Sequence, residues 1–298
     1  MSLFDTLVRY GMPMVPKAIV GRVARRYVAG ETLDDAVRTL RAMNEEGAMG
    51  TVDVLGEEVH ETGKAAAAVA EYLRLVERIM DEKIDANISI KPTMLGLKID
   101  QGLCEENVAT IVERAAELDN FVRIDMEDHT CTEATIQLYR RMHEHHPARV
   151  GIVLQSYLYR TIADINDLLP LDPNVRMCKG IYREPREVAW RDFETIRANF
   201  VYATEKLLSE GAYVGIATHD PYLVWAGMRI VDRLGLDPDR YEFQMLLGVD
   251  PELRRIILAN GHRLRVYVPY GRDWYPYSIR RLRENPTIAR HVMRAMLS

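Results

Sequence analysis

The sequence predicts an α/β protein built on a (β/α)8 barrel of the TIM type, preceded by N-terminal helices. Short runs rich in β-branched residues alternate with amphipathic stretches from residue 47 onward, at intervals of about 30 residues. The runs are almost continuously apolar, as in parallel strands that are covered on both faces. The alternative, a doubly wound open sheet, usually has fewer strands, and no glycine-rich dinucleotide fingerprint follows the first run.

Each expected strand is paired with the helix that follows it. We expect these pairs at 50–56 and 61–82, 86–92 and 104–119, 121–128 and 132–145, 149–157 and 160–169, 174–182 and 187–209, 212–220 and 221–235, 241–249 and 251–260, and 263–271 and 274–297. Residues 1–46 are expected to form a helical segment, and residues 47–298 a single barrel domain. The clearest helix of that segment begins after Thr32, which can cap it together with Asp35.

Composition and charge exclude several classes of protein. The chain has 298 residues, a net charge of −5 and a mean hydropathy of −0.19, so neither nucleic-acid binding nor a membrane span is expected. Three cysteines without metal-like spacing favour a reducing, cytoplasmic location and no disulfide framework. Segment 15–28 is basic and moderately amphipathic. A helix packed on the barrel is favoured there over contact with an anionic membrane surface.

Polar residues gather where the expected strands end, which is where the active site of such a barrel forms. Two of them, Lys91 and Lys179, stand within otherwise apolar runs, so each needs a neighbouring anion or must lose its charge. A metal site built from His129 and His219 is an alternative interpretation. The histidines at 143–146 also look like ligands, but they sit at a helix end away from the strand ends, and we expect no metal.

The stretch YPYSIRRLREN at 275–285 places unusual residues on one face of an expected helix. The residues at i, i+3, i+4 and i+7 are Tyr277, Arg280, Arg281 and Glu284. The first turns of this helix can lie over the barrel mouth. Glu284 can neutralise one guanidinium there, and the other would bind a carboxylate or a phosphate. A solvated, arginine-rich helix end is the alternative.

This stretch resembles the Tyr-x-x-Arg-Arg-x-x-Glu signature of the proline dehydrogenase family, the flavin enzymes that begin proline breakdown. Other stretches are similar to that family in the same order along the chain: ISIKPTMLG, VRIDMED, LQSYLYR, VRMCKGIY, IATHD, EFQMLLGV and VYVPYG. The resemblance extends from about residue 45 to the end. It implies a (β/α)8 barrel, in agreement with the alternation of strands and helices.

For the substrate, L-proline, the resemblance implies a set of binding residues: Lys91, Asp125, Leu246, Tyr267, Tyr277, Arg280 and Arg281. The two arginines would bind the carboxylate, with Lys91 as a third cation. Tyr267, Tyr277 and Leu246 would enclose the pyrrolidine ring, and Asp125 would stand beside Lys91 and the flavin. Glu57 matches a glutamate that pairs with the first arginine and gates the pocket, with its neighbour Glu58 as the alternative.

For the cofactor, FAD, the resemblance implies a second set: Val153, Gln155, Arg176, Cys178, Lys179, Gly180, Tyr182, Thr218, His219 and Glu284. Arg176 would lie near the flavin N5, and Gly180 would allow the backbone to approach the cofactor closely. Cys178 stands where the family commonly has a small aliphatic residue, and Asp220 where some members have asparagine. The second departure bears on FAD binding rather than on the chemistry.

The implied reaction transfers a hydride from C5 of proline, as a neutral amine, to the flavin and yields Δ1-pyrroline-5-carboxylate. The electrons would then pass to a membrane quinone, which implies a peripheral contact with the inner face of the cell membrane. Because no aldehyde dehydrogenase module is recognised in the chain, a separate pyrroline-5-carboxylate dehydrogenase is expected to consume the product.

Two rival functions use the same barrel, besides the metal hydrolase with His129 and His219. A Schiff-base aldolase would use Lys91 or Lys179 as its nucleophile and would be colourless. A binding or scaffold barrel would retain proline or flavin without turnover. The lysine, aspartate and arginine pair count against this last function, because binding alone does not need them all.

Overall fold

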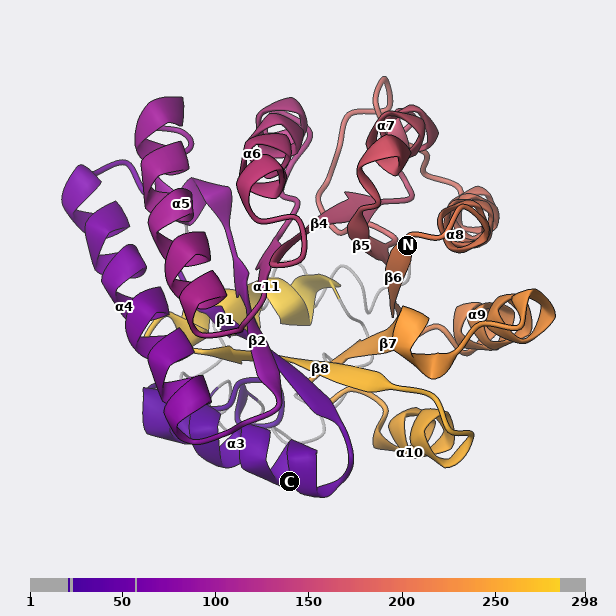
Figure 1. Ribbon diagram of the computed structural model, residues 1–298, viewed down its shortest axis with the longest axis horizontal. Coiled ribbons are helices and arrows are strands. Elements are labelled where there is room, and N and C mark those ends of the chain that lie inside the picture. Colours follow the sequence, from indigo (N-terminus) through magenta and orange to yellow (C-terminus); the bar gives the residue numbers. More distant parts are fainter. Residues whose placement is uncertain (1–20, 22–23, 57, 285–298) are drawn as a thin grey trace, which may run out of the picture.

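The computed structural model describes residues 21, 24–56 and 58–284, with side chains through residue 279. Within these residues, eight parallel strands close into a barrel in the order of the sequence, and β1 pairs with β8. A ring of helices covers the outer face of the sheet (Figure 1). The predicted (β/α)8 barrel is therefore confirmed, and the doubly wound sheet is wrong, because an open sheet has two edge strands with one neighbour each, whereas every strand here pairs with two.

The described elements follow the predicted alternation. The strands are β1 (Met49–Val54), β2 (Ala86–Ile90), β3 (Val122–Ile124), β4 (Val150–Gln155), β5 (Asn174–Cys178), β6 (Tyr213–Ala217), β7 (Tyr241–Leu246) and β8 (Leu264–Tyr270). The α-helices are α3 (Leu33–Glu45), α4 (Thr62–Asp81), α5 (Gln101–Glu117), α6 (Thr132–His145), α7 (Thr161–Leu168), α8 (Phe193–Ser209), α9 (Pro221–Leu234), α10 (Pro251–Ala259) and α11 (Trp274–Glu284). Short 3-10 helices lie at η2 (Pro92–Leu95), η3 (Leu169–Leu171) and η4 (Pro238–Arg240).

Several boundaries differ from the prediction, and two of them bear on the cavity. Helix α8 begins at Phe193 rather than at 187, because Asp192 caps it by accepting a hydrogen bond from the backbone of Thr195. The segment before it is irregular and forms only an isolated bridge between Leu158 and Ala189. Strand β3 ends at Ile124, four residues before the predicted run ends, so the acidic residues that follow it lie in a loop.

Helix α3 closes the barrel next to β1 and β8. Its predicted capping box is present, since Thr32 and Asp35 exchange side-chain and backbone hydrogen bonds. Leu40 of this helix is fully buried and occupies the space that a side chain at Gly50 would need. Part of the predicted N-terminal helical segment is thus confirmed. Most of segment 15–28 lies outside the described residues.

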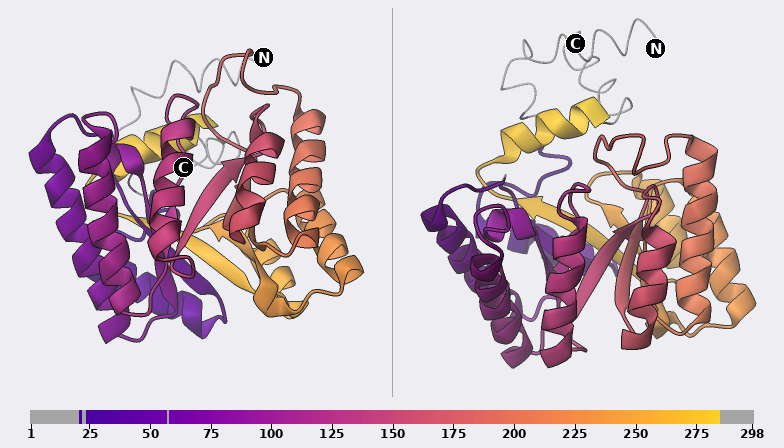
Figure 2. Two further views of the ribbon diagram at one scale, coloured as in Figure 1. Left: turned by 45° about the horizontal axis from the view of Figure 1, so that its top comes forward. Right: turned by 90° about the horizontal axis from the view of Figure 1, so that it is seen from above.

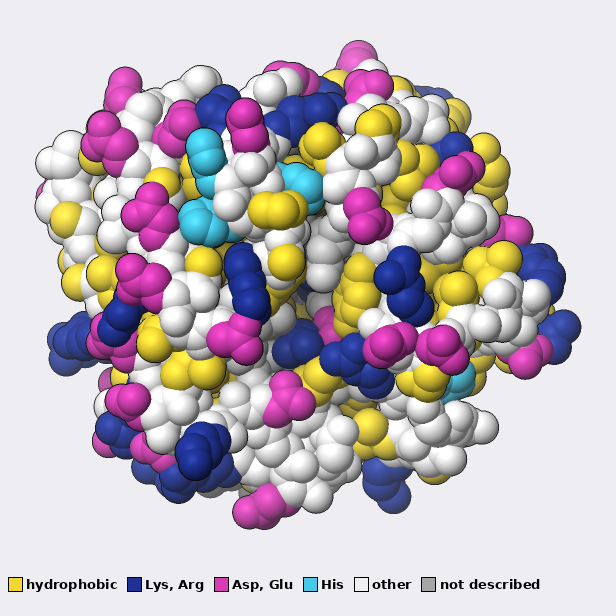
Figure 3. All heavy atoms as spheres, in the orientation of Figure 1, with side chains coloured by type: hydrophobic (Ala, Val, Ile, Leu, Met, Phe, Trp, Pro, Cys, Tyr) yellow, Lys and Arg dark blue, Asp and Glu magenta, His cyan; other side chains and the backbone are white. Residues whose placement is uncertain are grey.

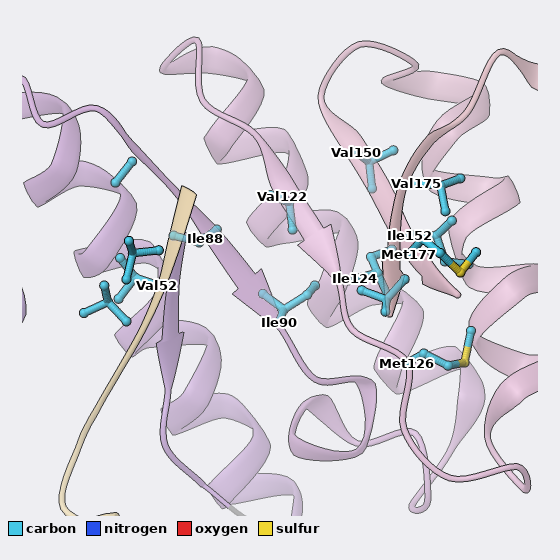
Figure 4. Close-up of a cluster of buried hydrophobic side chains, with 14 of the residues drawn as sticks. Val52, Ile88, Ile90, Val122, Ile124, Met126, Val150, Ile152, Val175 and Met177 are labelled. Carbon is cyan, nitrogen blue, oxygen red and sulfur yellow. The ribbon is translucent and has the colours of Figure 1, made fainter. Parts of the chain in front are cut away.

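The apolar core lies between the sheet and the helices. Figure 4 shows Val52, Ile88, Ile90, Val122 and Ile124 among the side chains of this layer, and all of these are fully buried. Burying one such side chain stabilises the fold by about 1.5–3 kcal/mol. Because side chains alternate along a strand, the residues between them point into the barrel, and many of those are polar.

Near the strand starts, the barrel interior holds a set of polar residues that we call the lower network: Arg123, Asn174, Tyr213, Glu242 and Arg265. Glu242 accepts hydrogen bonds from Arg265 Nε at 2.8 Å and from the Tyr213 hydroxyl at 2.9 Å. Arg123 donates to the carbonyl oxygens of Ile152 at 3.1 Å and Asn174 at 2.6 Å. Burial by itself raises the pKa of Glu242, but Arg265 outweighs it and the pKa is lowered.

Helix α11 lies at the other end of the barrel, where the strands finish (Figure 2). Its residue Tyr277 is buried against Val28 and Leu55. The helix confirms the helical spacing expected for 277, 280, 281 and 284. Among the described helices, none has the length and apolar character needed to cross a membrane.

Candidate active site

A cavity of about 510 Å³ opens at the carboxyl ends of the strands. Its lining includes all of the predicted site residues whose side chains are described: Lys91, Asp125, Val153, Gln155, Arg176, Cys178, Lys179, Gly180, Tyr182, Thr218, His219, Leu246, Tyr267 and Tyr277. Residues that are far apart in the sequence meet here because parallel strands bring their ends together. The remaining predicted positions, Glu57 and the side chains of Arg280, Arg281 and Glu284, lie outside the described residues.

Lys91 finds the anion that its position requires, and this anion was not predicted. Its ammonium pairs with Asp53, a fully buried residue of β1. Burial lowers the pKa of Lys91, but Asp53 and Asp125 together outweigh it, so the pKa is raised and the side chain is a cation at neutral pH. A permanently charged lysine is a poor Schiff-base nucleophile, which counts against the aldolase interpretation at this position.

Asp125 is held in place by several donors at the end of β3. Ser89 Oγ donates to one carboxylate oxygen at 2.8 Å, and the hydroxyl of Tyr267 donates to the other at 2.9 Å. The guanidinium of Arg176 lies 3.8 Å from the same carboxylate and 5.4 Å from the centre of the Tyr267 ring. These contacts fix the orientation of Tyr267 and Arg176 before any ligand binds.

Several buried polar atoms of the cavity lack a hydrogen-bond partner in the described part of the chain. They are Asp53 Oδ2, Gln155 Oε1, Arg176 Nε and Gln244 Oε1. Buried polar atoms in folded proteins are usually paired, and leaving one unpaired costs about 1–3 kcal/mol. A polar, partly aromatic ligand such as a flavin can supply both donors and acceptors, so the residues fit that class of cofactor.

The segment after β5 follows the wall of the cavity closely. Gly180 has a φ of +106°, and a side chain there would overlap the ring of Tyr157. The position therefore needs glycine for packing, a reason that the sequence did not reveal. The Cys178 thiol lies 3.5 Å from the Leu154 carbonyl, and burial raises its pKa, so it is a neutral thiol.

His219 connects the ends of β6 and β7. Its Nε2 accepts a hydrogen bond of 2.7 Å from the backbone N–H of Leu246, which places the proton of a neutral ring on Nδ1. The neighbouring Thr218 hydroxyl accepts from the backbone of Asp220 at 3.1 Å. These bonds set the positions of two predicted cofactor residues and of Leu246.

A cluster at the cavity mouth between β5 and β6 was largely missed by sequence reasoning. Arg197, from α8, pairs with Asp220 and stacks on the ring of Phe193 at 4.3 Å. Lys179 reaches the same carboxylate at 3.4 Å. Arg197 and Phe193 lie in an amphipathic helix whose start was misplaced, and their sequence carries no motif that marks them.

The loop after β1 contains Glu58, the alternative to Glu57 as the gate. The Glu58 carboxylate accepts a hydrogen bond of 2.7 Å from Lys98, and His60 Nε2 lies 3.4 Å from the same carboxylate. Lys98 also lies 3.5 Å from Asp128. Glu58 is therefore part of a surface cluster of charges. Glu57 lies outside the described residues, and its role as the gate stays a prediction.

The described residues contain no group of three or more histidine, cysteine, aspartate or glutamate side chains arranged to hold a metal. His129 instead pairs with the buried Glu184. The histidines near the end of α6 gather on the face where the strands begin (Figure 3), and His143 packs against Tyr139 with ring centres 5.3 Å apart. The geometry gives no support to the metal hydrolase interpretation.

Comparisons with known proteins agree with the function that the cavity residues suggest. A family model described as proline dehydrogenase matches residues 36–294. The proline dehydrogenase of Deinococcus radiodurans is 37% identical over 279 residues, which cover 92% of this chain and 90% of that protein. Proline dehydrogenase 1 of Bacillus subtilis strain 168 is 35% identical over 274 residues, with the same shares covered.

Two solved structures share the fold. Proline utilization A from Bdellovibrio bacteriovorus, inactivated by N-propargylglycine, superposes with a TM-score of 0.84 at 22% identity, covering 89% of this chain and 32% of that one. Proline utilization A from Corynebacterium freiburgense gives a TM-score of 0.79 at 21% identity, covering 98% and 34%. This chain spans about a third of those proteins, and at such identities the likeness concerns the barrel alone.

Proposed function

The chain belongs to the proline dehydrogenase family, and on that premise we propose that it oxidises L-proline to Δ1-pyrroline-5-carboxylate with FAD as its cofactor. When bound, FAD supplies the acceptor for the hydride that leaves C5 of proline. The observation that carries the proposal is the cavity at the strand ends, where fixed charges stand beside buried polar atoms that have no partner among the described residues. A polar ligand bound there can satisfy those atoms.

The substrate carboxylate is assigned to the side of the cavity that carries Lys91. This ammonium is mostly buried, remains charged and is held by Asp53, so it attracts an anion without having to reorganise. Arg280 and Arg281 on α11 would complete the clamp, because guanidinium groups bind a carboxylate in a bidentate fork. Glu57 would close the clamp by pairing with the first arginine.

The pyrrolidine ring is assigned to the space between Tyr267, Tyr277 and Leu246. Asp125 accepts the hydrogen bond of the Tyr267 hydroxyl, so that ring cannot turn away from the cavity. Walls of this kind exclude water and hold C5 in one orientation, which is a positioning effect. The proline nitrogen must be a neutral amine before the hydride can leave.

The cofactor is assigned to the side formed by β4, β5 and β6. The residues proposed to hold FAD are Val153, Gln155, Arg176, Cys178, Lys179, Gly180, Tyr182, Thr218, His219 and, on α11, Glu284. The buried Nε of Arg176 has no hydrogen-bond partner among the described residues, and a fixed positive charge at this position stabilises negative charge on a bound group.

The finer partners follow from the same proposal. Electrons are delivered to a membrane quinone, which requires a peripheral contact with the inner face of the cell membrane. The product is released to a separate pyrroline-5-carboxylate dehydrogenase. These partners rest on the family resemblance, and no contact in the described residues bears on them.

A product assay tests the proposed reaction. The full-length chain is incubated with FAD, a soluble quinone analogue and L-proline, and the product is captured by o-aminobenzaldehyde as a coloured adduct. We expect an adduct that depends on both FAD and L-proline. No adduct, together with a borohydride-trapped bond between a lysine and a carbonyl substrate, would establish the aldolase instead.

A further inference from the structure

Asp220 holds two cations at the mouth of the cavity. Arg197 donates to it through a two-pronged fork, with Nε and Nη2 each 2.8 Å from a carboxylate oxygen. Lys179 Nζ lies 3.4 Å from the oxygen that already accepts from Arg197 Nε. The Arg197 guanidinium is also held from its faces, 4.3 Å from the Phe193 ring centre and 5.1 Å from that of Tyr222.

Asp220, Arg197 and Lys179 together carry one positive charge in excess, and the exposed carboxylate of Glu194 lies 3.3 Å from the other side of the guanidinium, at Nη1. Burial raises the pKa of Asp220, but the hydrogen bond from Arg197 and the charge of Lys179 outweigh it, so the pKa is lowered and the carboxylate is ionised. Asp220 also accepts from the backbone of Tyr222 at the start of α9. Without Arg197, the carboxylate would be left with Lys179 alone. The pair would then be neutral, and an incoming anion would meet a carboxylate that is offset only by the ammonium 3.4 Å away.

The position of the cluster separates it from the substrate cations. Lys91 follows β2, whereas Asp220 follows β6, and these strands are opposite each other in a closed barrel of eight. Each side of the cavity therefore carries a lysine that contacts an aspartate, Lys91 with Asp53 and Lys179 with Asp220. A dinucleotide flavin has one strongly anionic part, its diphosphate, and lysine is a common phosphate ligand.

We propose that Arg197 is a positioning residue for the diphosphate of the bound dinucleotide, because it neutralises Asp220 and so leaves Lys179 to pair with a phosphate oxygen. The inference rests on the proposed function, since it takes FAD as the cofactor. It adds a residue outside the predicted set and gives a reason for the aspartate at position 220. Arg197 and Asp220 act as a pair whose charges cancel.

The test is a charge cycle measured as FAD affinity. The variants are Arg197→Met, Asp220→Asn and the double variant, with Arg229→Met as an exposed control on α9. The dissociation constant of FAD is measured by titrating the flavin-free full-length chain and following flavin fluorescence. Asparagine caps helices as well as aspartate does, so Asp220→Asn should keep the start of α9 intact.

We expect Arg197→Met to weaken FAD binding by about tenfold to 100-fold, because it leaves the Asp220 carboxylate without its guanidinium partner beside the phosphates. Asp220→Asn should bind FAD as tightly as the parent or more tightly. The double variant should recover to within about threefold of the parent, since the unpaired charge is gone. Riboflavin, which has no phosphate, should bind equally to all of them.

The outcomes separate a charge effect from misfolding. If Asp220→Asn does not restore the FAD affinity that Arg197→Met loses, the role of Arg197 is merely structural and the inference is overturned. The same holds if Arg197→Met loses as much affinity for riboflavin as for FAD. An Arg197→Met chain that binds FAD like the parent would also overturn it while leaving the proposed function intact. A parent chain that binds no FAD would overturn the proposed function and this inference together.

Discussion

Two groups of buried charges in the barrel interior differ in how completely they are paired. In the lower network, Arg265, Glu242 and Tyr213 satisfy one another, and none of their buried side-chain nitrogen or oxygen atoms lacks a partner. At the strand ends, Asp53, Gln155 and Arg176 each keep a buried polar atom without one in the described part of the chain. A closed network stabilises the barrel, whereas an open one is built to meet a ligand.

The largest expected effect concerns the closed network. Glu242→Leu leaves the Arg265 guanidinium buried without its carboxylate, which should lower the free energy of unfolding by about 3–5 kcal/mol. Urea unfolding followed by circular dichroism measures this. Glu113→Leu, an exposed change on α5, is the control and should stay within about 0.5 kcal/mol. A loss below about 1 kcal/mol for Glu242→Leu would contradict a structural role.

Changes to the charged residues at the strand ends should affect substrate binding more than the free energy of unfolding. Lys91→Met removes a cation that we assign to the substrate carboxylate, so the KM for L-proline should rise about 100-fold. The free energy of unfolding should fall by less than in Glu242→Leu, because burial raises the pKa of Asp53 and lets it take up a proton once the ammonium is gone. Steady-state kinetics and urea unfolding on the same preparation decide the point. An unchanged KM with a large loss of stability would place Lys91 among the structural residues.

The pH dependence of stability sharpens the same contrast. In the fold, Arg265 lowers the pKa of Glu242 against the effect of burial. The contribution of Glu242 to the free energy of unfolding is therefore complete above its unfolded pKa of about 4.3, and it is lost as the pH falls through its folded pKa. The parent should therefore lose stability below about pH 4.3 more steeply than Glu242→Gln, which keeps a hydrogen-bonding group without the titration. Unfolding free energies measured from about pH 6 to pH 3 test this. Parallel curves for the two proteins would remove Glu242 as the source of the acid sensitivity.

The smallest expected effect is on substrate choice. Tyr267→Ser removes the aromatic wall that Asp125 holds in place and opens space beside the proposed ring site. The ratio of hydroxyproline to proline turnover should rise about tenfold, while FAD content stays that of the parent. An unchanged ratio would mean that Tyr267 does not line the ring. Flavin absorbance per chain is the control for cofactor loss.

The sequence predicted the barrel because the spacing of apolar residues and the lengths of the strand and helix segments can be read from short stretches of the chain. Together with the family resemblance, it also predicted many of the residues that line the cavity, since parallel strands bring all their carboxyl ends to one edge. Lys91 was recognised as a charge in need of an anion, but its partner Asp53 was not. A single aspartate in the apolar run GTVDVLG was the available signal, because alternation places it on the inner face.

Contacts between distant segments could not be predicted in this way. The pairing of Arg197 with Asp220 depends on how α8 packs beside α9, and the lower network depends on strand register across β5 to β8. The start of α8 was misplaced because an amphipathic pattern continues through residues 187–192, while the cap at Asp192 decides where the helix begins. Register and caps follow from three-dimensional packing as well as from local sequence.

The most direct test of the central claim is a visible absorption spectrum of the purified full-length chain with FAD, recorded before and after anaerobic addition of L-proline. We predict a flavin band that bleaches on addition of L-proline and returns when a quinone is supplied. A colourless protein that gains no band with FAD, or a flavin band that L-proline leaves unchanged, would contradict the assignment of this cavity to proline oxidation.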